Sequence, residues 1–149
     1  MSNICIIPAR GGSKRIPKKN IKDFLGKPII AYSIELAIKS GLFDEVMVST
    51  DDIEIADIAK QFGASVPFMR SKKNSDDITG TGDVVFEVLK HFENEGSKFD
   101  ICCCLYATSP LTKMHVLKEA MNLLITKDFD VTFPVSKFNS PILRSYEVI

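Results

Sequence analysis

Short apolar runs alternate along this chain with longer stretches in which apolar residues recur every three or four positions. The short runs are apolar almost throughout and many are β-branched, which is typical of strands covered on both faces. They lie at residues 3–8, 45–49, 66–69, 100–105 and 130–134. Strands separated by helices predict an α/β fold, here a Rossmann-like three-layer αβα domain with a mostly parallel sheet.

Three amphipathic stretches carry their apolar residues on one helical face. Within residues 55–62 these residues recur at i, i+3, i+4 and i+7; Asp51 and Glu54 predict a capping box before them, and Gly63 predicts the stop. Similar stripes run over residues 84–92 and 117–124. We expect all three stripes to pack in the core rather than to bind a ligand.

A loop of glycines and basic residues follows the first predicted strand. It reads Ala9-Arg10-Gly11-Gly12-Ser13-Lys14 and continues to Lys19-Asn20. Glycines let backbone N–H groups approach an anion and the cations supply charge, so we expect a phosphate site, with a solvated basic turn as the alternative. The spacing excludes a Walker loop and the dinucleotide fingerprint G-x-G-x-x-G.

Polar residues also follow the other predicted strands. Asp51 comes after the second, Arg70 after the third and Thr108-Ser109-Pro110 after the fourth. Parallel sheets bind ligands outside the carboxyl ends of their strands, so we expect these segments and the Arg10 loop to line one crevice. The polar stretch 71–82 is expected to form its rim or lid. Asp51 and Asp52 fit a helix N-cap and first turn as well as a nucleotide contact.

The basic loop resembles the signature of the cytidylyltransferases that activate nonulosonic acids, the CMP-sialic acid synthetases and their relatives. That signature reads A-R-x-G-S-K, a spacer and K-N. Residues 43–52 resemble the family's second strand, which ends in S-T-D, and Arg70 with the acidic loop after it resembles the family's next motif. Residues 105–111 resemble L-Q-P-T-S-P-L. Tyr106 and Ala107 depart from that motif and, with the cysteines before them, resemble the pseudaminic acid subgroup.

The resemblance implies the fold of the nucleotide-diphospho-sugar transferases and a reaction in which a nonulosonic acid attacks the α-phosphate of CTP, giving CMP-sugar and pyrophosphate. It implies catalytic roles for Arg10 and Lys19, which would stabilise charge on the phosphates, and sugar-binding roles for Tyr106 and Ser109. The nucleotide-binding residues that it implies are Ala9, Arg10, Gly11, Gly12, Ser13, Lys14, Asn20, Arg70, Asp77 and Thr81.

The resemblance further implies Mg²⁺ bound with CTP, a homodimer, and protein ligands for the metal beyond residue 149. We therefore expect the 149 residues to form a single nucleotide-binding domain, truncated relative to the family, and we assign no metal ligand within it. Such a chain is expected to bind nucleotide without turnover, and its apolar end, with Ile142, Leu143, Val148 and Ile149, is expected to seek cover in a dimer or aggregate. A cytidylyltransferase for 2-keto-3-deoxyoctonate is the other alternative.

The composition argues against some classes of protein but does not indicate a function. The apolar content of 45% suffices for a core, and the formal net charge of zero gives no reason to expect a nucleic-acid partner. No apolar run predicts a membrane span and the first residues do not resemble a signal peptide, so we expect a cytoplasmic protein. We interpret Cys102, Cys103 and Cys104 as small buried hydrophobes, with Cys102 and Cys104 sharing a face with Cys5, and assign His91 and His115 no chemistry.

Overall fold

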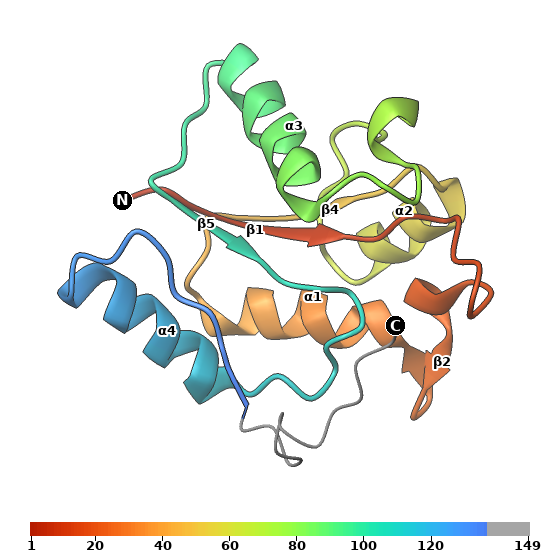
Figure 1. Cartoon of the computed structure of the whole chain (residues 1–149). Helices are drawn as coiled ribbons and strands as arrows, with labels where there is room; N and C mark the ends of the chain where they lie inside the picture. Colours follow the sequence, from red (N-terminus) through yellow and green to blue (C-terminus); the bar gives the residue numbers. More distant parts are fainter. Residues whose placement is uncertain (137–149) are drawn as a thin grey trace, which may run out of the picture. The chain divides into compact units, whose positions relative to one another are not determined.

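The computed structural model describes residues 1–136 (Figure 1). Its first compact unit spans Met1–Met114, and a second unit begins at His115. The helices are α1 (Ile29–Ser40), α2 (Ile53–Gln61), α3 (Thr81–Asn94) and α4 (Met114–Thr126), with short 3-10 turns η1 (Lys19–Ile21) and η2 (Lys72–Asn74). The strands are β1 (Asn3–Pro8), β2 (Asp23–Phe24), β3 (Lys27–Pro28), β4 (Glu45–Ser49) and β5 (Ile101–Cys104).

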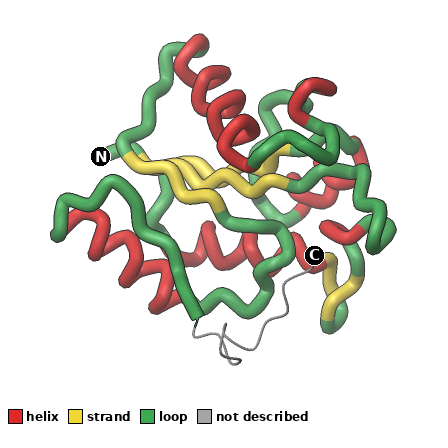
Figure 2. The backbone as a smooth tube through the Cα atoms, viewed as in Figure 1, coloured by secondary structure: helices red, strands yellow, loops and turns green. Residues whose placement is uncertain are grey.

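A parallel sheet lies at the centre of the first unit. Its strand order is β4-β1-β5, and β2 and β3 form a separate antiparallel pair. Helix α3 covers one face of the sheet and α1 lies on the other, as Figures 1 and 2 show. The predicted αβα layering with a mostly parallel sheet is confirmed, because each segment between neighbouring parallel strands returns through a helix.

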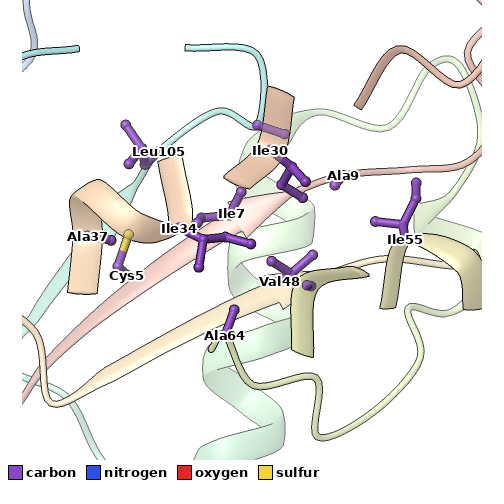
Figure 3. Packing of buried hydrophobic residues seen from close by; sticks show 12 residues of the cluster. Cys5, Ile7, Ala9, Ile30, Ile34, Ala37, Val48, Ile55, Ala64 and Leu105 are labelled. Atoms are coloured by element: carbon purple, nitrogen blue, oxygen red, sulfur yellow. The ribbon is translucent and has the colours of Figure 1, made fainter. Parts of the chain in front are cut away.

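Alternate residues of β1 divide the core into two clusters. Cys5 and Ile7 face α1 and α2 and pack with Ile34 and Ile55 in the larger cluster (Figure 3). Ile4 and Ile6 point to the opposite face, where they pack with Met47 and with Val88 of α3. Both faces of β1 are therefore buried from Ile4 to Ile7, which explains why the sequence is apolar at each of these positions.

Helix α1 was not among the helices that the apolar stripes predicted, yet it supplies much of the larger cluster. Its buried residues include Ile30 and Ile34, and it ends at Gly41, whose φ of 65° is the left-handed conformation that glycine adopts readily. The three predicted helical stripes all lie in observed helices, α2, α3 and α4.

Two predicted strands are wrong. Residues 66–69 form no strand; the strand-type pairing with β4 is limited to Ser65, which makes an isolated parallel bridge to Met47. Pro67 has no N–H to donate, so the pairing cannot continue. Residues 130–134 are irregular as well, with Val131 and Phe133 exposed. A strand requires a hydrogen-bonded neighbour, and this segment has none within the described residues.

The capping residue of α2 is Asp52 rather than the predicted Asp51. The Asp52 carboxylate accepts the N–H groups of Glu54 at 2.8 Å and Ile55 at 3.3 Å. The stop is at the expected place, since Gly63 has a φ of 92°. Asp51 is thereby left free to contact another segment of the chain.

The cysteines differ from the expectation in two ways. Cys103, not Cys102 or Cys104, is the register partner of Cys5 and packs on the same face, because residues in register on neighbouring strands point to the same side of the sheet. Cys102 and Cys104 are exposed rather than buried; they lie on the other face of β5 from Cys103, and neither belongs to a core cluster. Hydrogen bonding with Cys103 and burial raise the pKa of Cys5, which favours an inert thiol.

The second unit contains most of α4 and the segment after it. The hydroxyl of Thr132 donates to the backbone oxygen of Ala120 at 3.2 Å and ties that segment to the helix. The apolar residues 142, 143, 148 and 149 lie outside the described residues. Among the helices described, none has the length and apolar character required to cross a bilayer.

Candidate functional site

A polar cavity of about 240 Å³ lies beyond the carboxyl ends of β1 and β5. Its walls come from four parts of the chain: the loop after β1, the segment 70–79, the start of α3 and the segment after β5. The lining residues are Pro8, Arg10, Ser13, Lys19, Asn20, Arg70, Asn74, Asp76, Asp77, Thr79, Thr81, Val84, Tyr106, Ala107 and Thr108.

The loop after β1 is held by hydrogen bonds at both of its ends. At the start, Gly11 donates its N–H to the Asp51 carboxylate at 2.9 Å. At the end, the buried Asn20 donates its side-chain N–H to the backbone oxygen of Arg10 at 2.9 Å. A Cβ on Gly11 would lie 2.5 Å from Oδ2 of Asp52, so this close approach requires glycine. Arg10 is thereby presented to the cavity on a fixed turn.

Asp77 neutralises two cations of this loop. Its carboxylate is 2.6 Å from Nη2 of Arg10 and forms a second ion pair with Lys14. Lys14 and Arg10 hold the pKa of Asp77 below its ordinary value, so the carboxylate is charged at neutral pH. Two cations converging on one carboxylate form a site that a phosphate group could occupy instead.

Asp76 organises the segment that carries Asp77. Its Oδ1 accepts the N–H of Ile78 at 3.0 Å, and both the N–H and the hydroxyl of Thr79 at 2.6 and 2.7 Å. The Thr79 hydroxyl and these N–H groups lower the pKa of Asp76. Its backbone oxygen also accepts a hydrogen bond from Arg10. The expected rim is therefore a folded turn that contacts the basic loop.

Arg70 forms a second cationic wall, and it is buried, with an exposed fraction of 7%. Its Nε donates to Oγ of Ser49 at 3.0 Å and its Nη2 donates to the backbone oxygen of Ser49. Within residues 1–136 no carboxylate lies in ion-pair contact with it. Burial lowers its pKa, an effect that Asp51 and Glu87 oppose, and an arginine still keeps its charge. A buried cation without a carboxylate is suited to an anionic ligand.

Tyr106 links the segment after β5 to the start of α3. Its hydroxyl lies 2.9 Å from the hydroxyl of Thr81, and its backbone oxygen accepts the hydroxyl of Ser33 at 2.9 Å. The Tyr106 side chain is 53% exposed and lines the cavity. It therefore offers a polar group at the opening, where a second substrate could meet the first.

Comparison with known proteins identifies the family. The family model described as "Cytidylyltransferase" matches residues 4–145. The chain therefore belongs to the cytidylyltransferase family. The structure agrees, because the CMP:2-keto-3-deoxy-manno-octonic acid synthetase complexed with CTP superposes with a TM-score of 0.72 at 26% identity, over 86% of this chain and 49% of that one. The fold expected of a nucleotidyltransferase is thus confirmed.

Two curated relatives show which members of the cytidylyltransferase family this chain resembles. The pseudaminic acid cytidylyltransferase of Campylobacter jejuni is 49% identical over 146 residues, which cover 98% of this chain and 63% of the relative. The CMP-N,N'-diacetyllegionaminic acid synthase of Legionella pneumophila is 40% identical over 123 residues, covering 83% of this chain and 53% of the relative. The chain thus spans less than two thirds of the length of these enzymes.

Most of the predicted site residues of this cytidylyltransferase chain line the cavity, and the others do not. The predicted residues that line the cavity are Arg10, Ser13, Lys19, Asn20, Arg70, Asp77, Thr81 and Tyr106. Those that do not line it are Ala9, Gly11, Gly12, Lys14 and Ser109. The buried Ala9 instead donates its N–H to the backbone oxygen of Ser49 at 2.9 Å, which fixes the loop rather than contacting the cavity.

Sequence reasoning did not single out several residues of the cavity or of its support. Asn74, Asp76 and Thr79 line the cavity, and Ser49 holds the guanidinium of Arg70. Ser49 begins the S-T-D motif, which was the available signal for it. Asp76 and Thr79 carried a weaker signal, because an Asp followed three residues later by Thr is a common side-chain-capped turn.

Proposed function

We propose that this chain binds CTP in the cavity between Arg10 and Arg70, and that the enzyme it represents transfers CMP from CTP to a nonulosonic acid of the pseudaminic acid type, releasing pyrophosphate. The observation that supports this proposal is the convergence of two arginines from separate segments of the chain. Among the described residues Arg10 pairs with the Asp77 carboxylate and the Asp76 backbone oxygen, which an anion can replace, and Arg70 is buried without a carboxylate in ion-pair contact. The identity to the Campylobacter jejuni enzyme supports the sugar class.

The proposed chemistry is mainly electrostatic. The anomeric hydroxyl of the sugar attacks the α-phosphorus of CTP and pyrophosphate leaves, so negative charge grows on the phosphate oxygens. Arg10 offers a planar fork for two of those oxygens, and the exposed Lys19 adds a mobile point charge. Ser13 and Lys14 complete the phosphate-binding loop in this proposal.

In the same proposal, some of the remaining residues contact the nucleoside and the others contact the sugar. Asn20 presents both a donor and an acceptor, the pair needed to read the edge of a pyrimidine. Arg70 and Thr81 contact the cytidine, while Tyr106 and Ser109 meet the sugar at the opening. We also propose a dimer and a cytoplasmic location.

Mg²⁺ is expected to accompany CTP. Within residues 1–136 no three His, Cys, Asp or Glu side chains lie together as metal ligands. We therefore assign no described residue to Mg²⁺, and no step above depends on the metal.

CTP is expected to stabilise this chain more than ATP or GTP does. A ligand at about 100 times its dissociation constant adds about 2.7 kcal/mol to the free energy of unfolding, because it binds only the folded state. Thermal unfolding with each of CTP, UTP, ATP and GTP, with Mg²⁺ present throughout, measures the difference. Equal shifts for CTP and ATP would contradict the proposal.

Asp77→Asn is expected to tighten CTP binding about three- to fivefold. The triphosphate must displace the Asp77 carboxylate from Arg10 and Lys14, and asparagine keeps the shape of the side chain but not its charge. Titration calorimetry with CTP gives the affinity, and the exposed Asp57→Asn serves as a control for net charge. Weaker binding by Asp77→Asn would show instead that the carboxylate itself contacts the nucleotide.

A further inference from the structure

The turn from β4 into α2, residues 49–52, contacts both Arg70 and the basic loop that carries Arg10. On the Arg70 side, Ser49 accepts two hydrogen bonds from the guanidinium, and the backbone oxygen of Thr50 accepts the N–H of Arg70 at 2.8 Å. Ser49 and Thr50 are both buried. The position of Arg70 is thus determined by this turn through main-chain and side-chain contacts together.

The same turn holds the backbone of the basic loop on each side of Arg10. Before Arg10, Ala9 donates its N–H to the backbone oxygen of Ser49 at 2.9 Å. After Arg10, Gly11 donates its N–H to the Asp51 carboxylate at 2.9 Å. The first contact uses main-chain atoms only, so Asp51 is the side chain on which the second depends.

We infer that Asp51 is a positioning residue for nucleotide binding: its carboxylate holds the Gly11 amide and so fixes the backbone from which Arg10 reaches the nucleotide. This inference rests on the proposed CTP site. Asp51 does not contact the nucleotide in this arrangement. It acts through Gly11, and it lies near enough to Arg70 to favour the charged guanidinium.

The negative charge of Asp51 allows a positioning role to be distinguished from a direct electrostatic effect on the nucleotide. A carboxylate beside a triphosphate site repels the ligand, so a purely through-space effect predicts that removing it tightens binding. The positioning role predicts the opposite, because Arg10 would lose its fixed backbone and binding would then have to order the loop. The two explanations therefore differ in the sign of the effect.

Asp51 neither caps α2 nor packs in the core. Asp52, not Asp51, caps α2, so the helix keeps its cap when Asp51 is replaced. Asp51 is exposed and its side chain belongs to neither core cluster. Variants at this position are thus expected to fold.

The test compares Asp51→Ala, Asp51→Asn and the control Asp57→Ala by calorimetric titration with CTP and by hydrogen exchange of the Gly11 amide in the unliganded protein. Asp57 is exposed on α2, and among the described residues its side chain makes no hydrogen bond or ion pair. Asp51→Ala is expected to weaken CTP binding about tenfold and to speed exchange at Gly11 by a similar factor. Asp51→Asn, which keeps an acceptor oxygen, should stay within about threefold of the original chain in both measurements, and Asp57→Ala within about twofold.

Three outcomes overturn the inference: equal or tighter binding by Asp51→Ala, a loss with Asp51→Asn as large as with Asp51→Ala, or unchanged exchange at Gly11. If the unmodified chain does not bind CTP, the proposed function fails. The exchange measurement then still decides whether Asp51 holds the loop, because it requires no nucleotide.

Discussion

Arg10→Ala is expected to weaken CTP binding by about 10- to 100-fold while leaving the fold intact. A hydrogen bond to a charged group contributes about 1.5–3 kcal/mol, and each 1.4 kcal/mol is a tenfold change in affinity. Arg10 is partly exposed on a loop and contributes to neither core cluster, so its loss should change the free energy of unfolding much less than the free energy of CTP binding. Titration calorimetry gives the affinity, and urea unfolding gives the stability.

Two further variants test the explanation. Arg15→Ala removes a cation from the same loop, but Arg15 is exposed and does not line the cavity, so binding should change less than about twofold. Arg10→Lys keeps the charge without the planar fork and should recover only part of the affinity. A loss with Arg15→Ala equal to that with Arg10→Ala would indicate general attraction of the loop for anions rather than a specific contact.

Arg10 and Asp77 are also expected to be coupled. In the Arg10→Ala background, Asp77→Asn should tighten CTP binding less than it does in the original chain, because one of the two cations that Asp77 covers is already absent. The double variant measured beside both single variants gives this coupling. Additive effects would mean that the carboxylate and the triphosphate do not compete for Arg10.

Arg70→Met is expected to reduce CTP binding by about 10- to 100-fold and to change the free energy of unfolding of the unliganded chain by only about 1 kcal/mol. The guanidinium donates two hydrogen bonds to Ser49, which favours the folded state, but burying a cation without a carboxylate costs free energy. Methionine fills a similar volume and adapts its shape. Binding and stability should therefore separate.

The measurements are titration with CTP and urea unfolding without ligand. Arg70→Lys is the matched variant, since it keeps a charge but cannot donate to both oxygens of Ser49 as the arginine does. Arg70→Met with normal CTP affinity would assign Arg70 to support of the β4–α2 turn alone. Complete unfolding of Arg70→Met would show that the hydrogen bonds to Ser49 outweigh the cost of burial.

Local sequence patterns were sufficient for the elements whose signals are short-range. The apolar runs within β1 and β4 and the apolar stripes of α2, α3 and α4 predicted those elements, because the spacing of apolar residues indicates which faces are covered. The same patterns failed at residues 66–69, where Pro67 prevents pairing after Ser65. They failed again at 130–134, where an apolar run has no strand beside it among the described residues.

The basic loop and its place after β1 followed from the sequence alone, and so did the family, since four motifs in order are far more specific than any one of them. The partners of the loop did not follow. Asp77 contacts Arg10, Asp51 holds Gly11 and Ser49 holds Arg70 across 67, 40 and 21 positions of the chain. These groups come within hydrogen-bond distance only in the folded chain. The parallel sheet places the carboxyl ends of β1 and β4 side by side, and the segment before α3 brings Arg70 and Asp77 back to them. Local patterning determines which residues become strand, helix or loop, whereas contacts between distant side chains depend on register and on crossovers that no local pattern encodes.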